Sequence, residues 1–157
     1  GVFLTALPDD PMFVDITEQN GTFYMQREWC RTELVKEEDG GYRIGSLDEK
    51  IYFTDNEILY RLPGRVLTLT PAKPADPALF QEGIYYNDET DSFMKLVKVE
   101  NTCEIHMRRH EKTTLYQSTS GSIIFRMDAN LVMYVKAEND TIIMDGGRIK
   151  HIIYQKQ

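Results

Sequence analysis

The sequence predicts an all-β fold, an antiparallel barrel or a strongly bent β-sandwich built of meanders, with at most one short helix. Apolar and polar residues alternate over short runs, as they do in strands that turn one face toward a core. Turn-forming dipeptides such as Asn20-Gly21 separate these runs. The segment from Tyr116 to Tyr154 shows both features most clearly, because four β-type runs alternate there with polar turns.

The composition fits a soluble globular protein. The chain has 157 residues, of which 41% are hydrophobic and 27% charged, so it can bury a core without disulfides. Residues 1–100 carry 10 basic and 19 acidic side chains, whereas residues 101–157 carry 8 basic and 6 acidic ones. A chain with net charge −7 is repelled by a phosphate backbone, so we expect no nucleic-acid partner. No apolar run approaches the roughly 20 residues that span a bilayer, and we expect no membrane partner.

The first half reads as short strands that follow an N-terminal arm of residues 1–12. Strands are expected at Met12–Ile16, Thr22–Gln26, Trp29–Val35, Tyr42–Ile44, Lys50–Phe53, Glu57–Leu62 and Arg65–Thr70. Turns are expected at Asn20-Gly21, residues 37–41, Asp48-Glu49, residues 54–56 and Pro63-Gly64.

Three prolines between Pro71 and Pro77 predict a connector rather than a strand, because each proline removes a donor from a strand ladder. One helical turn can follow, with Asp76 as its cap. Residues 93–109 fit either a helix or a hairpin that turns at Asn101-Thr102, and we predict the hairpin. Later strands are expected at Ile84–Tyr86, Ser122–Asp128, Leu131–Val135, Thr141–Met144 and Ile149–Tyr154.

The two halves look alike, which indicates an internal repeat within a single β domain of residues 1–157. A shift of 74 residues places Tyr42–Leu69 on Tyr116–Ile143 without a gap. Repeats of this kind can decide an architecture, although any two meanders share alternation and turn residues. Two interpretations stay open: a duplication of segments 12–70 and 84–157 joined by a connector at 71–83, or two unrelated meanders.

The sequence assigns no cellular location. Its apolar start lacks the basic flank of a signal peptide, and a first residue other than methionine suggests a fragment of a longer protein. Cys30 and Cys103 permit one disulfide, but the sequence favours two reduced thiols.

Both halves resemble the β-sheet of a polo box. In the second half the resemblance rests on Tyr116-Gln117, Ile123–Asp128, Leu131–Tyr134, Ile142–Met144 and Tyr154. In the first half it rests on Tyr42, Phe53–Asp55 and Ile58–Tyr60.

Polo boxes are non-catalytic modules that dock proteins, sometimes phosphopeptides, and often dimerise. The resemblance therefore implies a docking role, a protein or peptide partner and a homodimer. The family's closing helix and its phosphopeptide-reading His and Lys have no counterpart in this sequence. The resemblance consequently assigns no site residues.

The run from Arg126 to Tyr134 resembles the mannose-binding motif of bulb-type lectins, Gln-x-Asp-x-Asn-x-Val-x-Tyr. Alternate side chains of a strand share a face, and the resemblance implies a sugar site of Asp128, Asn130 and Tyr134. Arg126 replaces the glutamine, one copy stands where those lectins have three, and a hairpin turn at 128–130 explains the same residues. Gly21–Tyr24 also resembles the Gly-x-Trp start of lipocalin barrels, with phenylalanine in place of tryptophan.

The segment from His106 to Lys112 carries the most chemistry. Arg108, Arg109, His110 and Lys112 form a cationic cluster that could accept a phosphate or carboxylate from a partner. A solvated edge strand protected by charge explains the same residues. His106 and His110 are four apart, as in some metal sites, but no third ligand follows at a familiar spacing. We predict no metal and no cofactor.

These patterns favour a binding protein over an enzyme. Phosphate-cradling glycine loops, nucleophile elbows and Cys-x-x-Cys pairs are absent from the sequence. We predict a non-catalytic protein-interaction module. The alternative is a β-barrel that binds a small apolar ligand or a sugar.

Overall fold

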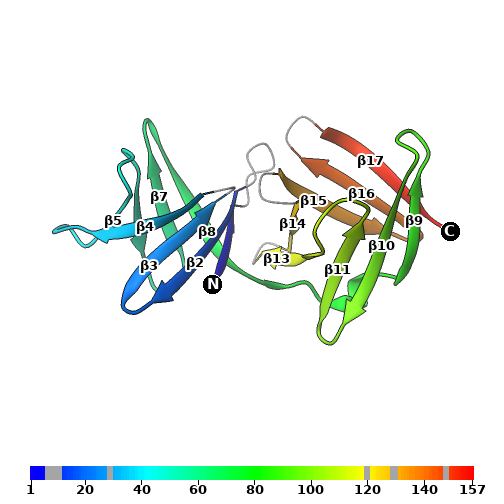
Figure 1. The fold of residues 1–157 in the computed structure, drawn as a ribbon, viewed down its shortest axis with the longest axis horizontal. Coiled ribbons are helices and arrows are strands. Elements are labelled where there is room, and N and C mark those ends of the chain that lie inside the picture. Colours follow the sequence, from blue (N-terminus) through cyan, green and yellow to red (C-terminus); the bar gives the residue numbers. More distant parts are fainter. Residues whose placement is uncertain (6–11, 28–29, 119–120, 128–130, 147–148) are drawn as a thin grey trace. The chain divides into compact units, whose positions relative to one another are not determined.

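The computed structural model describes residues 1–5, 12–27, 30–118, 121–127, 131–146 and 149–157 (Figure 1). Within these residues the fold is all-β and antiparallel, as predicted, with seventeen strands and one short 3₁₀ turn. The chain divides into two compact units, unit 1 (Gly1–Ala72) and unit 2 (Lys73–Gln157). No helix in this part of the chain is long and apolar enough to cross a membrane. The expectation of one domain with an internal repeat stays a prediction.

Unit 1 is a closed barrel of eight antiparallel strands in chain order. The N-terminal strand closes it, because β1 pairs with both β2 and β8. The strands are β1(Val2–Thr5), β2(Phe13–Gln19), β3(Thr22–Arg27), β4(Cys30–Lys36), β5(Tyr42–Ile44), β6(Lys50–Phe53), β7(Ile58–Leu62) and β8(Arg65–Pro74).

Two predicted turns of unit 1 form as expected. Asn20 and Gly21 connect β2 to β3 with φ angles of 53° and 81°, and these positive values match the two-residue hairpin turn favoured by strand twist. Pro63 and Gly64 connect β7 to β8, and Gly64 has φ 79°. Proline followed by a glycine at positive φ is the type II pattern.

Side chains fill the interior of unit 1. Tyr60 is fully buried, and its hydroxyl donates to the Glu49 carboxylate and accepts from Arg27 Nη1 at 3.2 Å. Burial and the bond to Glu49 both raise the pKa of Tyr60. The core consists of Met12, Val14, Ile16, Met25, Leu34, Ile44, Ile51, Ile58, Tyr60, Leu67 and Leu69.

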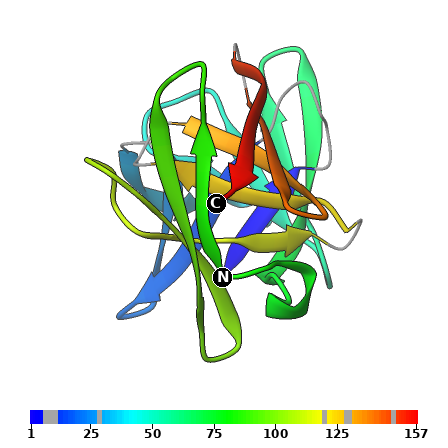
Figure 2. The same cartoon turned by 90° about the vertical axis from the view of Figure 1, so that its right-hand side faces the viewer.

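Unit 2 is a second meander whose last strand returns to its first, since β17 pairs with both β16 and β9 (Figure 2). Only Leu115 separates β12 from β13, and its N–H donates to the Cys103 carbonyl at 2.9 Å. The elements are η1(Pro77–Leu79), β9(Gly83–Asn87), β10(Ser92–Val99), β11(Thr102–Met107), β12(Thr113–Thr114), β13(Tyr116–Ser118), β14(Ile123–Met127), β15(Leu131–Glu138), β16(Thr141–Gly146) and β17(Ile149–Lys156).

Unit 2 has a core of its own. It consists of Ala75, Phe80, Tyr85, Met94, Leu96, Cys103, Ile105, Leu115, Phe125, Met133, Val135, Ile142, Met144 and Tyr154. Cys103 is buried in it, Cys30 is exposed in unit 1, and both thiols are free.

The proline-rich connector was predicted to lie outside any strand, and this is wrong for residues 71–74. Strand β8 continues to Pro74, and Pro71 pairs with Phe3 of β1. The pairing of β8 with β7 ends at Leu69, so Pro71 needs no donor toward β7. Proline is tolerated where a strand does not have to donate to a neighbouring strand.

Two further predictions concern residues that follow the connector. The helical turn is present as η1, and the Asp76 carboxylate accepts from the Ala78 N–H at 2.9 Å. The predicted hairpin is also present as β10 and β11. Its turn is Glu100-Asn101, one residue earlier than expected, because Val99 pairs with Thr102.

The ungapped shift of 74 residues does not hold across the whole repeat. Ile51 and Phe125 both lie in the cores, but Tyr60 is fully buried while Tyr134 is half-buried and outside the unit 2 core. The connection from β6 to β7 has one residue more than that from β14 to β15. A slip of one residue turns a strand's side chains to the opposite face, so Met133 takes the inward position instead.

Candidate functional site

A groove of about 640 Å³ opens on unit 2 beside the loop that follows β11. Three segments that are distant in sequence line it: the start of β10 with the preceding loop, the end of β11 with the following loop, and β17. We call it the cationic groove. Its lining residues are Thr90, Asp91, Ser92, Phe93, Met107, Arg108, Arg109, His110 and Tyr154.

Hydrogen bonds hold the floor of the cationic groove. Tyr154 is buried in the unit 2 core, and its hydroxyl lies 3.1 Å from Ser92 Oγ. Ser92 Oγ in turn lies 2.6 Å from Thr90 Oγ1. These hydroxyl groups therefore form a continuous chain of hydrogen bonds from β17 to the β9–β10 loop. Met107 adds an apolar side chain to the lining.

Phe93 is an exposed aromatic residue of this groove. It faces outward because its neighbours Met94 and Leu96 face the core, and it is 56% exposed. Its ring packs on that of Tyr86, its partner on β9, with ring centroids 4.8 Å apart. A large apolar surface held in place next to charge is typical of binding sites.

The cationic side chains follow directly after β11. Arg108, Arg109 and His110 are exposed, and the His110 N–H donates to the Met107 carbonyl at 3.2 Å, which closes a turn. Within the described residues, the guanidinium groups of Arg108 and Arg109 form no hydrogen bond or ion pair. Lys112 is exposed in the same loop but does not line the groove. Three of the four predicted binding residues are thus brought together.

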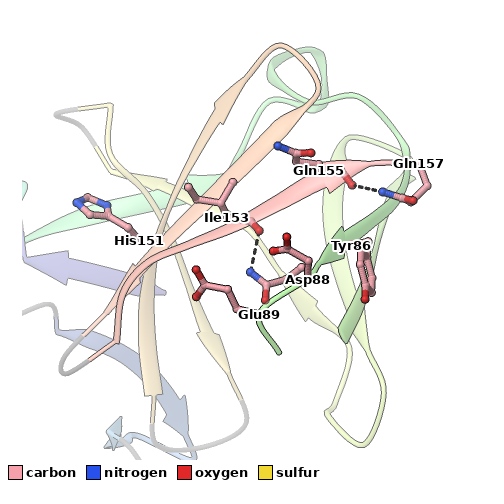
Figure 3. Close-up of a pocket in the computed structure, with 8 residues that line it drawn as sticks. Tyr86, Asp88, Glu89, His151, Ile153, Gln155 and Gln157 are labelled. Atoms are coloured by element: carbon pink, nitrogen blue, oxygen red, sulfur yellow. Dashed lines mark hydrogen bonds between the residues drawn. The ribbon is translucent and has the colours of Figure 1, made fainter. Parts of the chain in front are cut away.

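A second hollow of about 340 Å³ lies along β17, and we call it the acidic pocket (Figure 3). Asp88 and Glu89 enter it from the loop after β9, and Ile153 and Gln155 enter it from β17. Figure 3 shows His151 at the far end of β17 from Gln157. The full lining is Tyr86, Asn87, Asp88, Glu89, His151, Ile153, Gln155 and Gln157.

Asn87 fixes the loop that separates the two hollows. Its side chain is only 2% exposed, and its amide N–H₂ donates to the Ile153 carbonyl at 2.8 Å, the bond drawn to Ile153 in Figure 3. Its side-chain oxygen accepts from the Thr90 N–H at 2.8 Å and from Thr90 Oγ1 at 2.7 Å. This buried side chain uses both its donor and its acceptor to anchor the loop on β17.

The histidines do not assemble into a metal site in the described part of the chain, where no group of three or more potential ligands occurs. His106 lies on β11 with Nε2 3.1 Å from Glu104 Oε2. β11 ends at Met107, so His110 does not share a strand face with His106. His151 Nδ1 lies 3.2 Å from Asp145 Oδ1.

The lectin-like run does not lie on one strand. β14 ends at Met127 and β15 begins at Leu131, and Arg126 pairs with Val132 across the two strands. Asp128 and Asn130 lie outside the described residues. Tyr134 is half-buried beside a hollow of about 380 Å³. That hollow is lined by Leu79, Gly121, Ser122, Ile123, Tyr134, Val135, Lys136 and Ala137.

Sequence reasoning identified the cationic cluster but missed the remaining lining of its groove. The exposure of Phe93 could have been predicted, because Phe93 falls on the opposite strand face from Met94 and Leu96 once residues 93–109 are taken as a hairpin. Tyr154 carries no such signal, since only the return of β17 to β9 brings it near β11. Comparison of the chain with known protein families and with curated proteins finds no match.

Proposed function

We propose that the chain is a non-catalytic docking module that binds an acidic segment of a partner protein in the cationic groove. One observation carries the proposal. The exposed guanidinium groups of Arg108 and Arg109 have no partner among the described residues, and they border an open groove that also holds an exposed aromatic ring.

Two physical arguments support this proposal. A guanidinium group offers paired donors that match a carboxylate or a phosphate. Phe93 and Met107 add apolar surface on which a neighbouring side chain of the partner can pack. Because the charges are exposed, each ion pair contributes at most about 1 kcal/mol and is screened by salt. The proposal therefore describes a weak, salt-sensitive interaction.

The test is fluorescence anisotropy with a labelled peptide that contains aspartates around a central leucine. Arg108→Ala combined with Arg109→Ala should weaken binding about threefold to tenfold, the loss expected for two exposed ion pairs. The control is Lys36→Ala combined with Arg61→Ala, which removes two exposed charges from unit 1. Equal losses from both double variants would show that only net charge matters and would contradict a specific groove.

The polo-box resemblance of the two halves agrees with a docking role and implies a homodimer, and both stay predictions. A second proposal is the β-barrel that binds a small apolar ligand or a sugar. The hollow beside Tyr134, with Leu79, Ile123 and Ala137 in its lining, favours it. Calorimetric titration with mannose and with a fatty acid tests it, with Tyr134→Ala as the matched variant. Absence of heat from the unmutated protein would end this proposal.

A further inference from the structure

We infer that the docked segment is bipolar: it carries an acidic residue for the cationic groove, a basic residue for the acidic pocket, and an apolar side chain between them. The inference rests on the proposed function, because one end of the segment occupies the cationic groove. It goes further by assigning a role to the acidic pocket.

The strand register places Arg108 and Phe93 of the cationic groove in one outward-facing row with Tyr86 and Gln155 of the acidic pocket. Phe93 on β10 pairs with Tyr86 on β9, and Tyr86 pairs with Gln155 on β17. Arg108 follows β11 next to Phe93, because the preceding residue, Met107, pairs with Met94. The row therefore runs from a cation, across two aromatic rings, to an amide that lines the acidic pocket.

Apolar surface continues across this face. Phe93 is exposed at one side, and Ile153, which is 44% exposed, lies on β17 in the lining of the acidic pocket. Two exposed apolar residues bordered by opposite charges form a surface that favours one orientation of a bound segment. A segment of one charge sign would meet repulsion at one of its ends.

The charges of the acidic pocket are available to a partner. Asp88 and Glu89 are exposed and form no hydrogen bond or ion pair with any residue the structure describes. Asp91, in the same loop, differs because its carboxylate accepts from the Tyr86 hydroxyl at 2.8 Å. That bond raises the pKa of Tyr86.

The loop keeps the opposite charges apart. Asn87 ties its beginning to β17 through the Ile153 carbonyl, and Thr90 is bound to the Asn87 side chain. Asp88 and Glu89 consequently stand on the β17 side of the loop, while Thr90 and Asp91 line the cationic groove. A surface organised before binding loses less entropy when a partner docks.

The strand spacing sets the spacing of charges in the partner. Two steps between neighbouring strands separate the end of β11 from β9, whose following loop carries Asp88 and Glu89, and three steps separate it from β17. At about 4.8 Å per step this amounts to roughly 10 to 14 Å. An extended segment advances about 3.3 Å per residue, so the acidic and basic residues of the partner should lie roughly three to four positions apart.

The test compares three labelled peptides by fluorescence anisotropy. The first has aspartates and lysines about three to four positions apart around a leucine, a spacing set by the strands. The second has glutamines in place of the lysines, and the third has the composition of the first with acid and base adjacent. The first should bind the unmutated protein about threefold to tenfold more tightly than either of the others. Asp88→Asn combined with Glu89→Gln should abolish the advantage over the second peptide, with an unchanged melting temperature as the check on folding.

The outcomes separate this inference from the proposed function. Equal binding of all three peptides overturns the bipolar segment, whereas a loss of binding in Arg108→Ala/Arg109→Ala would still support the cationic groove. A dimer, seen by light scattering, that dissociates in either charge variant while no peptide binds would overturn the inference in favour of a second copy of the chain.

Discussion

Unit 1 and unit 2 are both antiparallel meanders, but the strand that joins the two ends of each meander comes from opposite ends of the chain. In unit 1 the four-residue N-terminal strand β1 lies between β2 and β8, whereas in unit 2 the eight-residue C-terminal strand β17 lies between β16 and β9. At the first junction β1 has a partner on both sides, since Phe3 pairs with Val14 of β2 and with Pro71 of β8. Both hollows of the candidate site border the second junction. The strand that joins the two ends of unit 2 therefore lies beside the candidate site.

The hairpins next to these junctions explain part of the difference. Strands β2 and β3 are joined by the two residues Asn20-Gly21, but β9 and β10 are joined by the four residues 88–91. The longer loop supplies Asp88 and Glu89 to one hollow and Thr90 and Asp91 to the other. The two additional residues of the β9–β10 loop therefore provide polar surface on unit 2.

The largest expected effect concerns the two cores. Phe125→Ala should destabilise unit 2 by about 3–5 kcal/mol, and Ile51→Ala should destabilise unit 1 by about 2–5 kcal/mol, because each empties a fully buried position. The Cys103 thiol reports on unit 2 alone, since it is buried there and burial raises its pKa to about 11. Phe125→Ala should therefore accelerate the labelling of Cys103 by a thiol reagent about a hundredfold or more.

Ile51→Ala is the matched control for that measurement, and it should leave the rate of Cys103 labelling unchanged. Equal acceleration by both substitutions would mean that the units open together, and the comparison of two separate cores would fail.

The closing strands should differ in what they contribute. Tyr154 of β17 is buried in the core and bonded to Ser92, so Tyr154→Ala should cost about 3–5 kcal/mol. Phe3 of β1 is only partly buried, and Phe3→Ala should cost about 1–2 kcal/mol. Urea denaturation measures both losses. If Phe3→Ala proves the more costly, β1 is the stronger closing strand and the account is wrong on this point.

The two hairpins provide the next test. Asn87→Ala removes bonds to Ile153 and Thr90 in a buried setting and should cost about 1–3 kcal/mol. Asn20→Ala, at a position with φ 53°, should cost about 1 kcal/mol through backbone strain. Asn87→Asp keeps the acceptor for Thr90 but places a buried carboxylate against the Ile153 carbonyl, so it should cost at least as much stability as Asn87→Ala. A cost for Asn87→Ala below that for Asn20→Ala would show that the loop is not anchored in this way.

The smallest effect concerns an acidic turn of unit 1. Lys50 binds the Asp39 carboxylate at 2.9 Å, and this bond, with those from the Gly41 N–H and the Tyr52 hydroxyl, lowers the pKa of Asp39 from 3.8 to about 2. The carboxylate is the form that favours the fold. Its contribution is therefore complete above the ordinary pKa and is lost as the pH falls from about 4 toward 2.

Titration of the Asp39 carboxyl carbon by NMR measures this directly. The midpoint should lie near 2 in the unmutated protein and rise in Lys50→Met. A midpoint near the ordinary value in both proteins would remove the contrast between this satisfied turn and the open loop of unit 2.

The sequence predicted the local features because their causes are local. Asn20-Gly21 and Pro63-Gly64 form turns through their own backbone preferences, and the alternation around Met94 and Leu96 separates core from surface. The positions of β1 and β17 have no such local cause. β1 pairs with β8, and β17 pairs with β9. Each of these pairings joins strands from opposite ends of a unit, so it depends on contacts across the whole unit.

The candidate site was predictable to the extent that its residues are adjacent in the chain. Arg108, Arg109 and His110 follow one another, so their charge is visible in the sequence. Tyr154 reaches the same groove only through the closure of unit 2. The ungapped repeat alignment also placed Tyr60 on Tyr134, although only Tyr60 is fully buried, because a one-residue difference in a turn leaves no mark in a pattern of alternation.

We propose that docking occurs where β17 meets β9 in unit 2. The most direct test is a titration of the isotope-labelled protein with the acidic peptide, followed through the backbone amide signals. We expect the largest shifts on Phe93 and on residues 107–110, and we expect them to disappear in Arg108→Ala/Arg109→Ala. Shifts centred on unit 1, or spread evenly over the exposed basic residues of both units, would contradict the proposal.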